Sequence, residues 1–276
     1  MELIRGQTAP SVWVAALEYL DKQPKAIDFD VFLHIEEPTV LTAEDRLVYD
    51  TIDTFLKTRG AFSVHTVAET IFPLDEYQHA GASGVFKDYP EKVRAIQKAR
   101  PDGNWGSYAY RILRQKDKTG ELFNPLEELL QKIKDHHNYA ACFELSSGHL
   151  LDNDQAPFED DIRIFDGATD RKRLRSGPCL SHLSIKVHDG NIRFNATYRS
   201  HYYMRKLLGN MVGLARLQYF LARESQLGVG GLTINSTFAC IDTGSGEDAG
   251  GRWTKAEARA LIKQCRAIYD NTRVAA

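Results

Sequence analysis

The chain has 276 residues, 43% of them hydrophobic, and a formal net charge of −2. This charge gives no general attraction to a polyanion, so we expect no nucleic-acid partner. No run of about 18 apolar residues could cross a bilayer, and the first residues lack the order of a secretory signal, so the sequence predicts a cytoplasmic protein without membrane association. No stretch has the composition of a linker, and we expect a single domain over residues 1–276.

The chain contains four widely separated cysteines, and their spacing limits the kinds of cysteine site to expect. None of them forms a C-x-x-C pair, which argues against a zinc ribbon and against a dense disulfide framework. In a reducing cytoplasm they are expected to be free thiols. They are Cys142, Cys179, Cys240 and Cys265.

The first quarter of the chain predicts mainly helix. Between Thr42 and Gly60, apolar residues recur at helical spacing and the glycine provides a stop. Thr42 with Asp45 predicts an N-terminal cap. Residues 101–103, Pro-Asp-Gly, are a turn signal before an aromatic segment that we expect near a cleft.

The rest of the chain alternates between strand and helix patterns. Asn124 and Pro125 open a helix with one apolar face, and from about residue 139 the hydrophobic period changes to two. The sequence predicts strands at 139–146, 180–188, 191–200 and 231–242, a hairpin turn at Asp189-Gly190, a long buried helix at 203–223, and a last helix capped by Thr254 and Glu257. Strands beside long helices, without a repeating βαβ rhythm, indicate an α+β fold.

One hairpin brings a candidate nucleophile and a cation together. Cys179 follows Gly-Pro at the start of a strand, and the returning strand ends in Arg199 and Ser200. A guanidinium beside the thiol favours the thiolate, and the same fork of donors with a neighbouring hydroxyl suits a phosphate. The pattern predicts a nucleophilic cysteine next to a phosphorylated substrate.

These residues resemble the thymidylate synthase family. The family carries Pro-Cys at a strand start, a DG hairpin, a strand ending in Arg-Ser and a long helix containing an asparagine. The resemblance extends from about residue 69 to residue 242, with spacings that match without gaps, and implies a thymidylate synthase-like fold in which a mostly antiparallel or mixed sheet packs on a long central helix and surrounding helices. The matching positions are Pro178-Cys179, Asp189-Gly190, Arg199-Ser200 and Asn210.

The resemblance also implies an activity. The thiolate of Cys179 would add to C6 of a pyrimidine nucleoside monophosphate, so that C5 can attack the one-carbon unit of 5,10-methylenetetrahydrofolate and take up a methyl or hydroxymethyl group. Asn210 would read the base edge, because an amide suits uracil whereas an aspartate would suit cytosine. Tyr108 matches the tyrosine near the family's active site, and Glu69 is the candidate general base. A homodimer is implied as well.

Several positions depart from the family pattern. No arginine stands near residues 137–139, where the family's second phosphate-binding arginines fall, and Arg171, Arg173 and Arg175 are possible substitutes. The family's sugar-reading motif aligns with a segment in which Ser236, a candidate substrate contact, replaces a tyrosine. Such changes resemble the branch that modifies UMP or CMP. The other changed positions are Leu232, Ile234, Tyr202 and Lys206.

Other interpretations stay open. Cys179 could be a small buried hydrophobe, Arg199 a surface ion-pair partner and Asn210 a partner for a backbone carbonyl. The runner-up function is a catalytically silent nucleotide-binding relative. A third is a hydrolase or a deglycosylating enzyme that uses the nucleotide pocket, with Glu69 activating water. The adjacent histidines at 136–137 point in different directions at a helix end, so we expect no metal site there. Residues 243–251 lack the ending of a phosphate-binding loop, so we expect a surface loop.

Overall fold

The computed structural model describes residues 1–98, 107–117, 119–136, 144–145, 177–243 and 253–275. Several sequence predictions lie outside these ranges. They concern the turn at 101–103, residues 137–139, Cys142, the arginines at 171–175 and most of the loop at 243–251.

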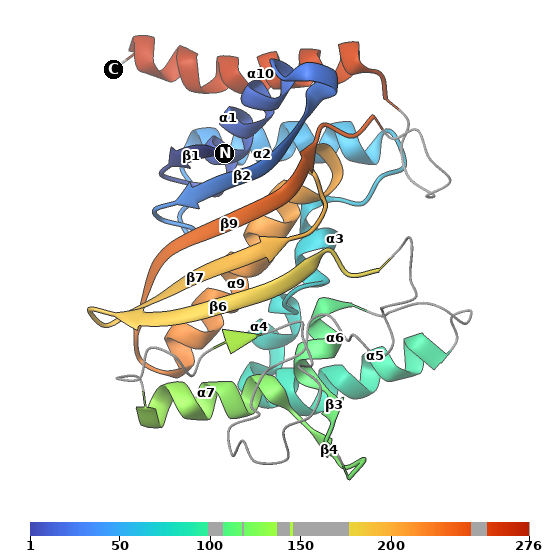
Figure 1. The fold of residues 1–276 in the computed structure, drawn as a ribbon, viewed down its shortest axis with the longest axis vertical. Coiled ribbons are helices and arrows are strands. Elements are labelled where there is room, and N and C mark those ends of the chain that lie inside the picture. The colour runs from blue at the N-terminus through green and yellow to red at the C-terminus, as the bar shows by residue number, and fades with distance from the viewer. Residues whose placement is uncertain (99–106, 118, 137–143, 146–176, 244–252, 276) are drawn as a thin grey trace.

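Helices and strands alternate along the chain in an α+β arrangement (Figure 1). The first half contains β1 (Glu2–Gly6), α1 (Ala9–Asp21), η1 (Pro24–Ala26), β2 (Ile27–Ile35), α2 (Ala43–Lys57), α3 (Val64–Glu69), α4 (Leu74–Ser83), η2 (Gly84–Asp88), α5 (Tyr89–Lys98), α6 (Tyr108–Leu113), β3 (Gln115–Lys116), β4 (Leu122–Phe123) and α7 (Pro125–His136). The second half contains β5 (Glu144–Leu145), β6 (Leu180–His188), β7 (Asn191–Tyr198), β8 (His201–Tyr202), η3 (Tyr203–Leu207), α9 (Leu208–Glu224), β9 (Gly228–Cys240) and α10 (Lys255–Ala275).

One mixed sheet organises the described part of the chain. Its strand order is β1-β2-β9-β7-β6-β5, and β8 also pairs with β9. β1 runs parallel to β2 and β7 parallel to β9, whereas the β2–β9, β6–β7 and β5–β6 pairs are antiparallel. The expected α+β class with a mixed sheet is confirmed.

The hairpin between β6 and β7 forms where the sequence predicts it. Asp189 and Gly190 have φ values of 49° and 70°, so both central residues of the turn are left-handed, as a two-residue hairpin with the right twist requires. Pairing then runs from His188 with Asn191 back to Leu180 with Tyr198. The hairpin therefore brings the start of β6 beside the end of β7.

The predicted central helix is α9, with the turn η3 before it. Figure 1 shows it behind the sheet, and α3 packs on it as well. Gly209 and Gly213 permit this close approach, because an added Cβ would lie 2.5 Å from the Cβ of Val67 and 2.8 Å from that of Ile71. The helix is buried along most of its length, between sheet and α3.

Local capping signals are confirmed. Thr42 and Asp45 form a capping box at the start of α2, and Gly60 follows that helix with a φ of 69°. Thr254 and Glu257 exchange the same pair of bonds before α10, and the carbonyl Oδ1 of Asn124 accepts from the N–H of Glu127 at the start of α7.

The prediction of a mainly helical first quarter is wrong in part. Two strands, β1 and β2, lie there and join the main sheet. In β2 the buried Val31, Leu33 and Ile35 alternate with more exposed neighbours, which is the period of a strand. The alternation expected in β9 also shifts at its end, where Ala239 is buried and Phe238 is only half-buried.

Buried side chains from Ile4 to Cys265 belong to one hydrophobic cluster between the sheet and its helices. α10 lies across one end of the molecule beside α1 and α2, and α5, α6 and α7 lie toward the other (Figure 1). Among the described residues, no helix is long and apolar enough to cross a membrane.

Candidate functional site

The ends of β6 and β7 place Cys179 beside Arg199. The backbone N–H of Arg199 donates to the carbonyl of Cys179 at 2.9 Å, and its side-chain Nε donates to the carbonyl of Pro178 at 2.8 Å. Arg199 and Ser200 form a bend between β7 and β8. Both strands pair with β9, whereas the two residues of the bend do not. Arg199 is exposed and Ser200 is half-buried.

Tyr108 belongs to the same site. Its buried hydroxyl accepts the backbone N–H of Cys179 at 2.7 Å and that of Leu180 at 3.0 Å. Tyr108 begins α6, and the next residue, Ala109, donates its N–H to the carbonyl of Thr70 at 2.9 Å. The structure thus brings three of the predicted residues, Cys179, Arg199 and Tyr108, together.

Burial and charge act in opposite directions on the Cys179 thiol. Burial raises its pKa and is the largest influence, whereas the positive charges of Arg199 and Lys206 lower it. The expected effect of Arg199 therefore has the right sign, but it does not outweigh desolvation in the protein without ligand. Neutral thiol predominates until the surroundings change.

Tyr198 is a second tyrosine at this place, and the sequence does not single it out. Burial raises the pKa of its hydroxyl, and the charges that Tyr108 and Cys179 would carry raise it further. This hydroxyl is buried without a hydrogen-bond partner among the described residues. Because Tyr198 continues the apolar alternation of β7, its pattern indicates only a core residue.

Asn210 and Ser236 are joined by a histidine that the sequence analysis did not identify. The Nδ2 of Asn210 lies 2.9 Å from Nε2 of His201, whose Nδ1 lies 2.9 Å from the Oγ of Ser236. The hydroxyl of Tyr203 donates to the same Oγ at 3.2 Å. Ser236 is fully buried, so its hydroxyl serves this network in the structure.

Asp242 fixes the turn that leads into α9. Its carboxylate accepts the backbone N–H of Met204 at 2.9 Å and the Nε of Arg205 at 2.7 Å. Lys206 follows Arg205 in the chain. Its ammonium lies 5.6 Å from the ring centre of Phe62, a residue that is 62% exposed. Lys206 therefore lies within electrostatic reach of the Cys179 thiol and beside the exposed ring of Phe62.

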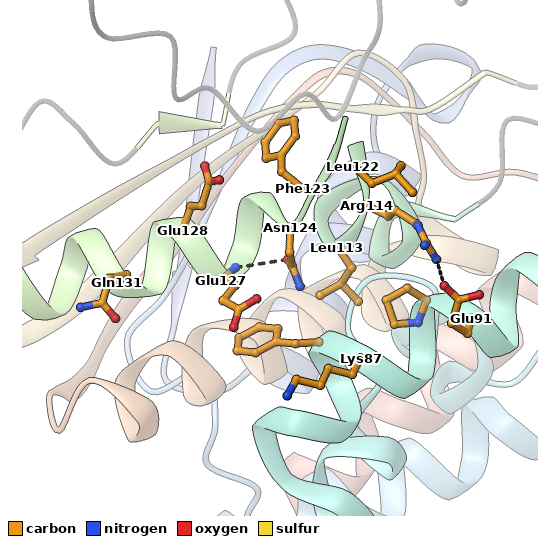
Figure 2. A pocket seen from close by; sticks show the side chains of 12 residues that line it. Lys87, Glu91, Leu113, Arg114, Leu122, Phe123, Asn124, Glu127, Glu128 and Gln131 are labelled. Carbon is orange, nitrogen blue, oxygen red and sulfur yellow. Dashed lines mark hydrogen bonds and ion pairs between the residues drawn. The ribbon is translucent and has the colours of Figure 1, made fainter. Parts of the chain in front are cut away.

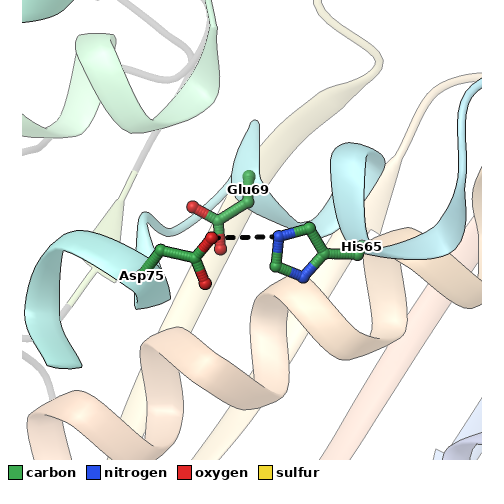
Figure 3. Close-up of side chains that lie close together, drawn as sticks. All are labelled: His65, Glu69 and Asp75. Atoms are coloured by element: carbon green, nitrogen blue, oxygen red, sulfur yellow. Dashed lines mark hydrogen bonds and ion pairs between the residues drawn. The ribbon is translucent and has the colours of Figure 1, made fainter.

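Glu69 lies in a different cluster. Figure 3 shows Glu69, His65 and Asp75 turned toward one another, with ligand-type atoms within 4.8 Å. Burial raises the pKa of Glu69, while Arg216 lowers it. Among the interactions of the described residues, no hydrogen bond joins Glu69 to Cys179, so a general-base role stays a prediction.

Arg216 supplies the positive charge of this cluster. Its Nη1 donates to Oε1 of Glu69 at 2.8 Å, and its Nη2 lies 3.1 Å from Nδ1 of His65. His65 in turn contacts Asp75 at 3.2 Å. Arg216 pairs with Glu69, and Asp75 contacts His65, so these contacts are explained as a polar network, and we assign no metal to it.

A hollow of about 640 Å³ lies apart from Cys179, between α7 and the η2–α5 segment (Figure 2). Its charges are mixed: Arg114 pairs with Glu91, and Lys87 lies across from Glu127. None of the predicted site residues lines it. The thiol site is therefore the better candidate on chemical grounds.

Comparisons with known proteins give no family assignment. No protein-family model matches the chain, and a search of curated proteins found no match. The functional interpretation therefore depends on the residues described above.

Proposed function

We propose that the chain transfers a one-carbon unit from 5,10-methylenetetrahydrofolate to C5 of a pyrimidine nucleoside monophosphate through a covalent adduct on Cys179. The observation that carries this proposal is the contact of Cys179 with Arg199 and Tyr108 at the end of the β6–β7 hairpin, with Asn210 on the following helix. This is the arrangement that the resemblance to thymidylate synthases implies. The mixed sheet and the central helix are compatible with that fold.

The chemistry begins at the thiol. The sulfur of Cys179 bonds to C6 of the pyrimidine, and the electron pair of the C5–C6 double bond moves onto C5 and the 4-oxygen as an enolate. C5 then becomes a nucleophile. C5 would bond to the methylene carbon of the folate and lose its proton, and the bond from that carbon to the folate nitrogen would break. Hydride from the tetrahydrofolate, or water, would then add to this carbon as the sulfur leaves, which restores the C5–C6 double bond and gives a methyl or a hydroxymethyl group, respectively. Arg199 and Lys206 promote the first step because their charges favour the thiolate.

Binding of a phosphate is consistent with the exposed guanidinium of Arg199. The carbonyl of Pro178 accepts its Nε–H and orients the planar group. Ser200 follows in the same bend and supplies a hydroxyl. An anion bound here would also offset part of the positive charge of Arg199, which stabilises the thiolate of Cys179. Phosphate binding and thiol reactivity are therefore coupled.

The residues near the thiol also fit the folate. A pteridine is flat and aromatic and its glutamate tail is anionic, and the exposed ring of Phe62 beside the ammonium of Lys206 offers a stacking surface and a cation. When bound, the folate supplies the one-carbon unit. Phe62 and Lys206 would hold it.

The first experiment measures tritium release from 5-tritiated UMP, dUMP, CMP and dCMP, with and without methylenetetrahydrofolate. Addition at C6 makes the C5 hydrogen exchangeable, so we expect release from at least one nucleotide. Cys179→Ala should abolish it, whereas Cys265→Ala, at a buried cysteine in α10, should retain it. Full exchange by Cys179→Ala would exclude the mechanism.

A silent nucleotide-binding relative is the second candidate. It is favoured by Ser236, whose hydroxyl is occupied by His201 and Tyr203. Binding of a pyrimidine nucleotide without exchange at C5 would support it. The proposed homodimer is tested separately by sedimentation at micromolar concentration, where a monomer would contradict it.

A further inference from the structure

A second hollow, of about 760 Å³, lies among α2, α3, α4 and α9, and we call it the α2–α9 pocket. Its volume is in the range of sites for small organic ligands, roughly 300–1,000 Å³. None of the residues assigned above to the nucleotide, and neither Phe62 nor Lys206, lines it. The pocket is therefore separate from the thiol site.

The helix α9 turns one face to this pocket and another to the network of Asn210. Val212, Arg216 and Tyr219 line the pocket, and they follow Asn210 by two, six and nine residues. At 3.6 residues per turn, these intervals place them roughly 180–240° around the helix axis from Asn210. A ligand in the α2–α9 pocket would therefore lie on the opposite face of α9 from Asn210.

Two donors on one face of α2 line the pocket without a partner. Arg46 and Tyr49 are three residues apart, so their side chains lie on the same side of the helix. Among the described residues, neither the guanidinium of Arg46 nor the hydroxyl of Tyr49 has a hydrogen-bond or ion-pair partner. Burial raises the pKa of the Tyr49 hydroxyl, which therefore stays a protonated donor. A forked cation beside a phenol O–H suits a carboxylate.

Arg216 belongs to another wall of the pocket and is held in place. Its side chain is 15% exposed, and its guanidinium contacts Glu69 at 2.8 Å and His65 at 3.1 Å, two residues that Figure 3 shows beside α9. Its charge lowers the pKa of Tyr49, so it lies within electrostatic reach of that hydroxyl. Because Glu69 already shares this charge, the unbalanced cation of the pocket is Arg46.

The remaining lining is largely apolar. Leu74, Val212 and Ala215 contribute buried or half-buried surface, and Leu41 and the ring of Tyr219 are 39% and 37% exposed. Apolar and aromatic side chains with a few convergent polar groups are the composition of a small-molecule site. A flat ring that carries one anionic group matches this combination.

One carboxylate, that of Asp50, also lines the pocket. It follows Arg46 by four residues on α2, but among the described residues the two form no ion pair. Asp50 is exposed, so solvent and salt screen its charge. Its repulsion grows with the negative charge of a ligand, which favours a ligand with a single anionic group.

We propose that the α2–α9 pocket is a second ligand site of the chain and that it binds a small aromatic monocarboxylate. Arg46 and Tyr49 bind the carboxylate group, and the apolar side chains of α4 and α9, Leu74 and Val212 among them, hold the ring. The ligand and a nucleotide at Cys179 do not compete for space, since the pocket lies on the other face of α9. The site does not depend on the proposed function.

Titration calorimetry of the full chain with 1-naphthylacetate and with 1-naphthylacetamide tests the proposal. The two compounds have the same ring and nearly the same size, but only the first is charged at pH 7. We expect the unmodified protein to bind the carboxylate about tenfold or more tightly than the amide. Arg46→Gln should remove this preference by weakening the carboxylate alone, whereas Arg193→Gln, at an exposed arginine of β7, should retain it. Arg46 is itself exposed, so its replacement should leave the fold intact.

Three further variants locate the ligand within the pocket. Tyr49→Phe removes only the hydroxyl and should weaken the carboxylate by about threefold or more. Asp50→Asn removes the repelling charge and should strengthen the carboxylate without changing the amide. Val212→Phe fills the pocket from α9 and should weaken both compounds to the same degree.

Several results would overturn the proposal. They are equal affinities for the two compounds in the unmodified protein, a preference that survives Arg46→Gln, undiminished binding of both compounds by folded Val212→Phe, and no binding of either compound at millimolar concentration. Calorimetry needs no nucleotide, so these results stand whether or not tritium is released from any of the four nucleotides. Failure of the proposed function is thereby distinguished from failure of this one.

Discussion

Two opposing influences act on the pKa of the Cys179 thiol: desolvation raises it, and the two cations Arg199 and Lys206 lower it. Because burial is the larger influence, we predict that alkylation by iodoacetamide keeps accelerating above pH ~8.5, the ordinary pKa of a thiol. Arg199→Gln removes one of the lowering charges and should slow alkylation at pH 8 by about threefold or more. The measurement is peptide mass spectrometry against pH.

The control for this prediction is Arg193→Gln, which removes an exposed arginine from β7, the strand that precedes Arg199. It should leave the alkylation rate of Cys179 unchanged. A rate that levels off well below pH 8, or equal slowing by both variants, would contradict the account of the thiol.

His201 gives a separate prediction about stability. The unfolded chain takes up a proton at the ordinary pKa of 6.5, whereas the folded chain does not until about 3. The free energy of unfolding should therefore fall as pH falls below 6.5, by about 1.4 kcal/mol per pH unit. Tyr198 and Tyr203, which face the ring, have raised pKa values and stay neutral in this range.

Urea unfolding at pH 7 and pH 5 tests this dependence. His201→Gln should lose stability over this interval by about 2 kcal/mol less than the unmodified protein. Equal dependence on pH in the variant and in the unmodified protein would show that His201 is protonated in the fold.

The sequence could identify only part of the site at this scale. Cys179, Arg199 and Tyr108 stand out because their types and spacing match a known pattern, and the structure brings them together. Tyr198 and His201 could not be identified, because an alternating aromatic residue indicates a core and a lone histidine after Arg-Ser carries no local signal. Their roles depend on contacts between β7, β8, β9 and α9.

Among the secondary-structure elements, local signals were the reliable ones. The caps at Thr42 and Thr254 and the turn at Asp189-Gly190 are decided within four residues, and all three are confirmed. The sequence analysis did not identify β1, which is short, or β2, although the alternation of Val31, Leu33 and Ile35 is a strand signal within the segment. Register and strand order could not be read from any single segment.

The packing of α3 on α9 yields a prediction with a rescue. Alanine is a better helix former than glycine by about 1 kcal/mol, yet Gly209→Ala should destabilise the protein by about 1–3 kcal/mol, because the new Cβ would lie 2.5 Å from Val67. Adding Val67→Ala removes the opposing methyl groups and should restore part of the loss. Urea unfolding of the single and double variants measures this coupling.

Additive losses in the double variant would show that Gly209 does not contact Val67 in solution. The carbonyl of Val64 lies 3.1 Å from the same Cβ position, so complete rescue is not expected.

At the scale of the whole molecule, ion pairs connect the last helix, α10, to the first helix, α1. Arg266 in α10 forms an ion pair with Glu18 in α1, and Arg259 donates to Asp21 at 2.7 Å. Exposed pairs of this kind contribute little, typically below about 1 kcal/mol each. A buried carboxylate, Asp45, makes the stronger connection.

Asp45 joins three parts of the fold and has no solvent exposure. It accepts the hydroxyl of Thr8 at 2.9 Å, that of Tyr269 at 2.6 Å and the backbone N–H of Thr42 at 2.8 Å. Asp45→Ala removes the acceptor of all three donors, of which the Thr8 hydroxyl keeps the Oγ of Ser11 at 3.1 Å, and should lower the free energy of unfolding by about 3 kcal/mol or more.

Tyr269→Phe removes one of these bonds and should lower the free energy of unfolding by about 1–2 kcal/mol. In the double variant with Asp45→Ala the losses should not add, since the two groups share one bond. Asp50→Ala, at an exposed position of the same helix, should change stability by less than about 0.5 kcal/mol. Strict additivity at positions 45 and 269 would mean that α10 is not fastened to α2 through this carboxylate, and that the two ends of the chain are held by apolar packing alone.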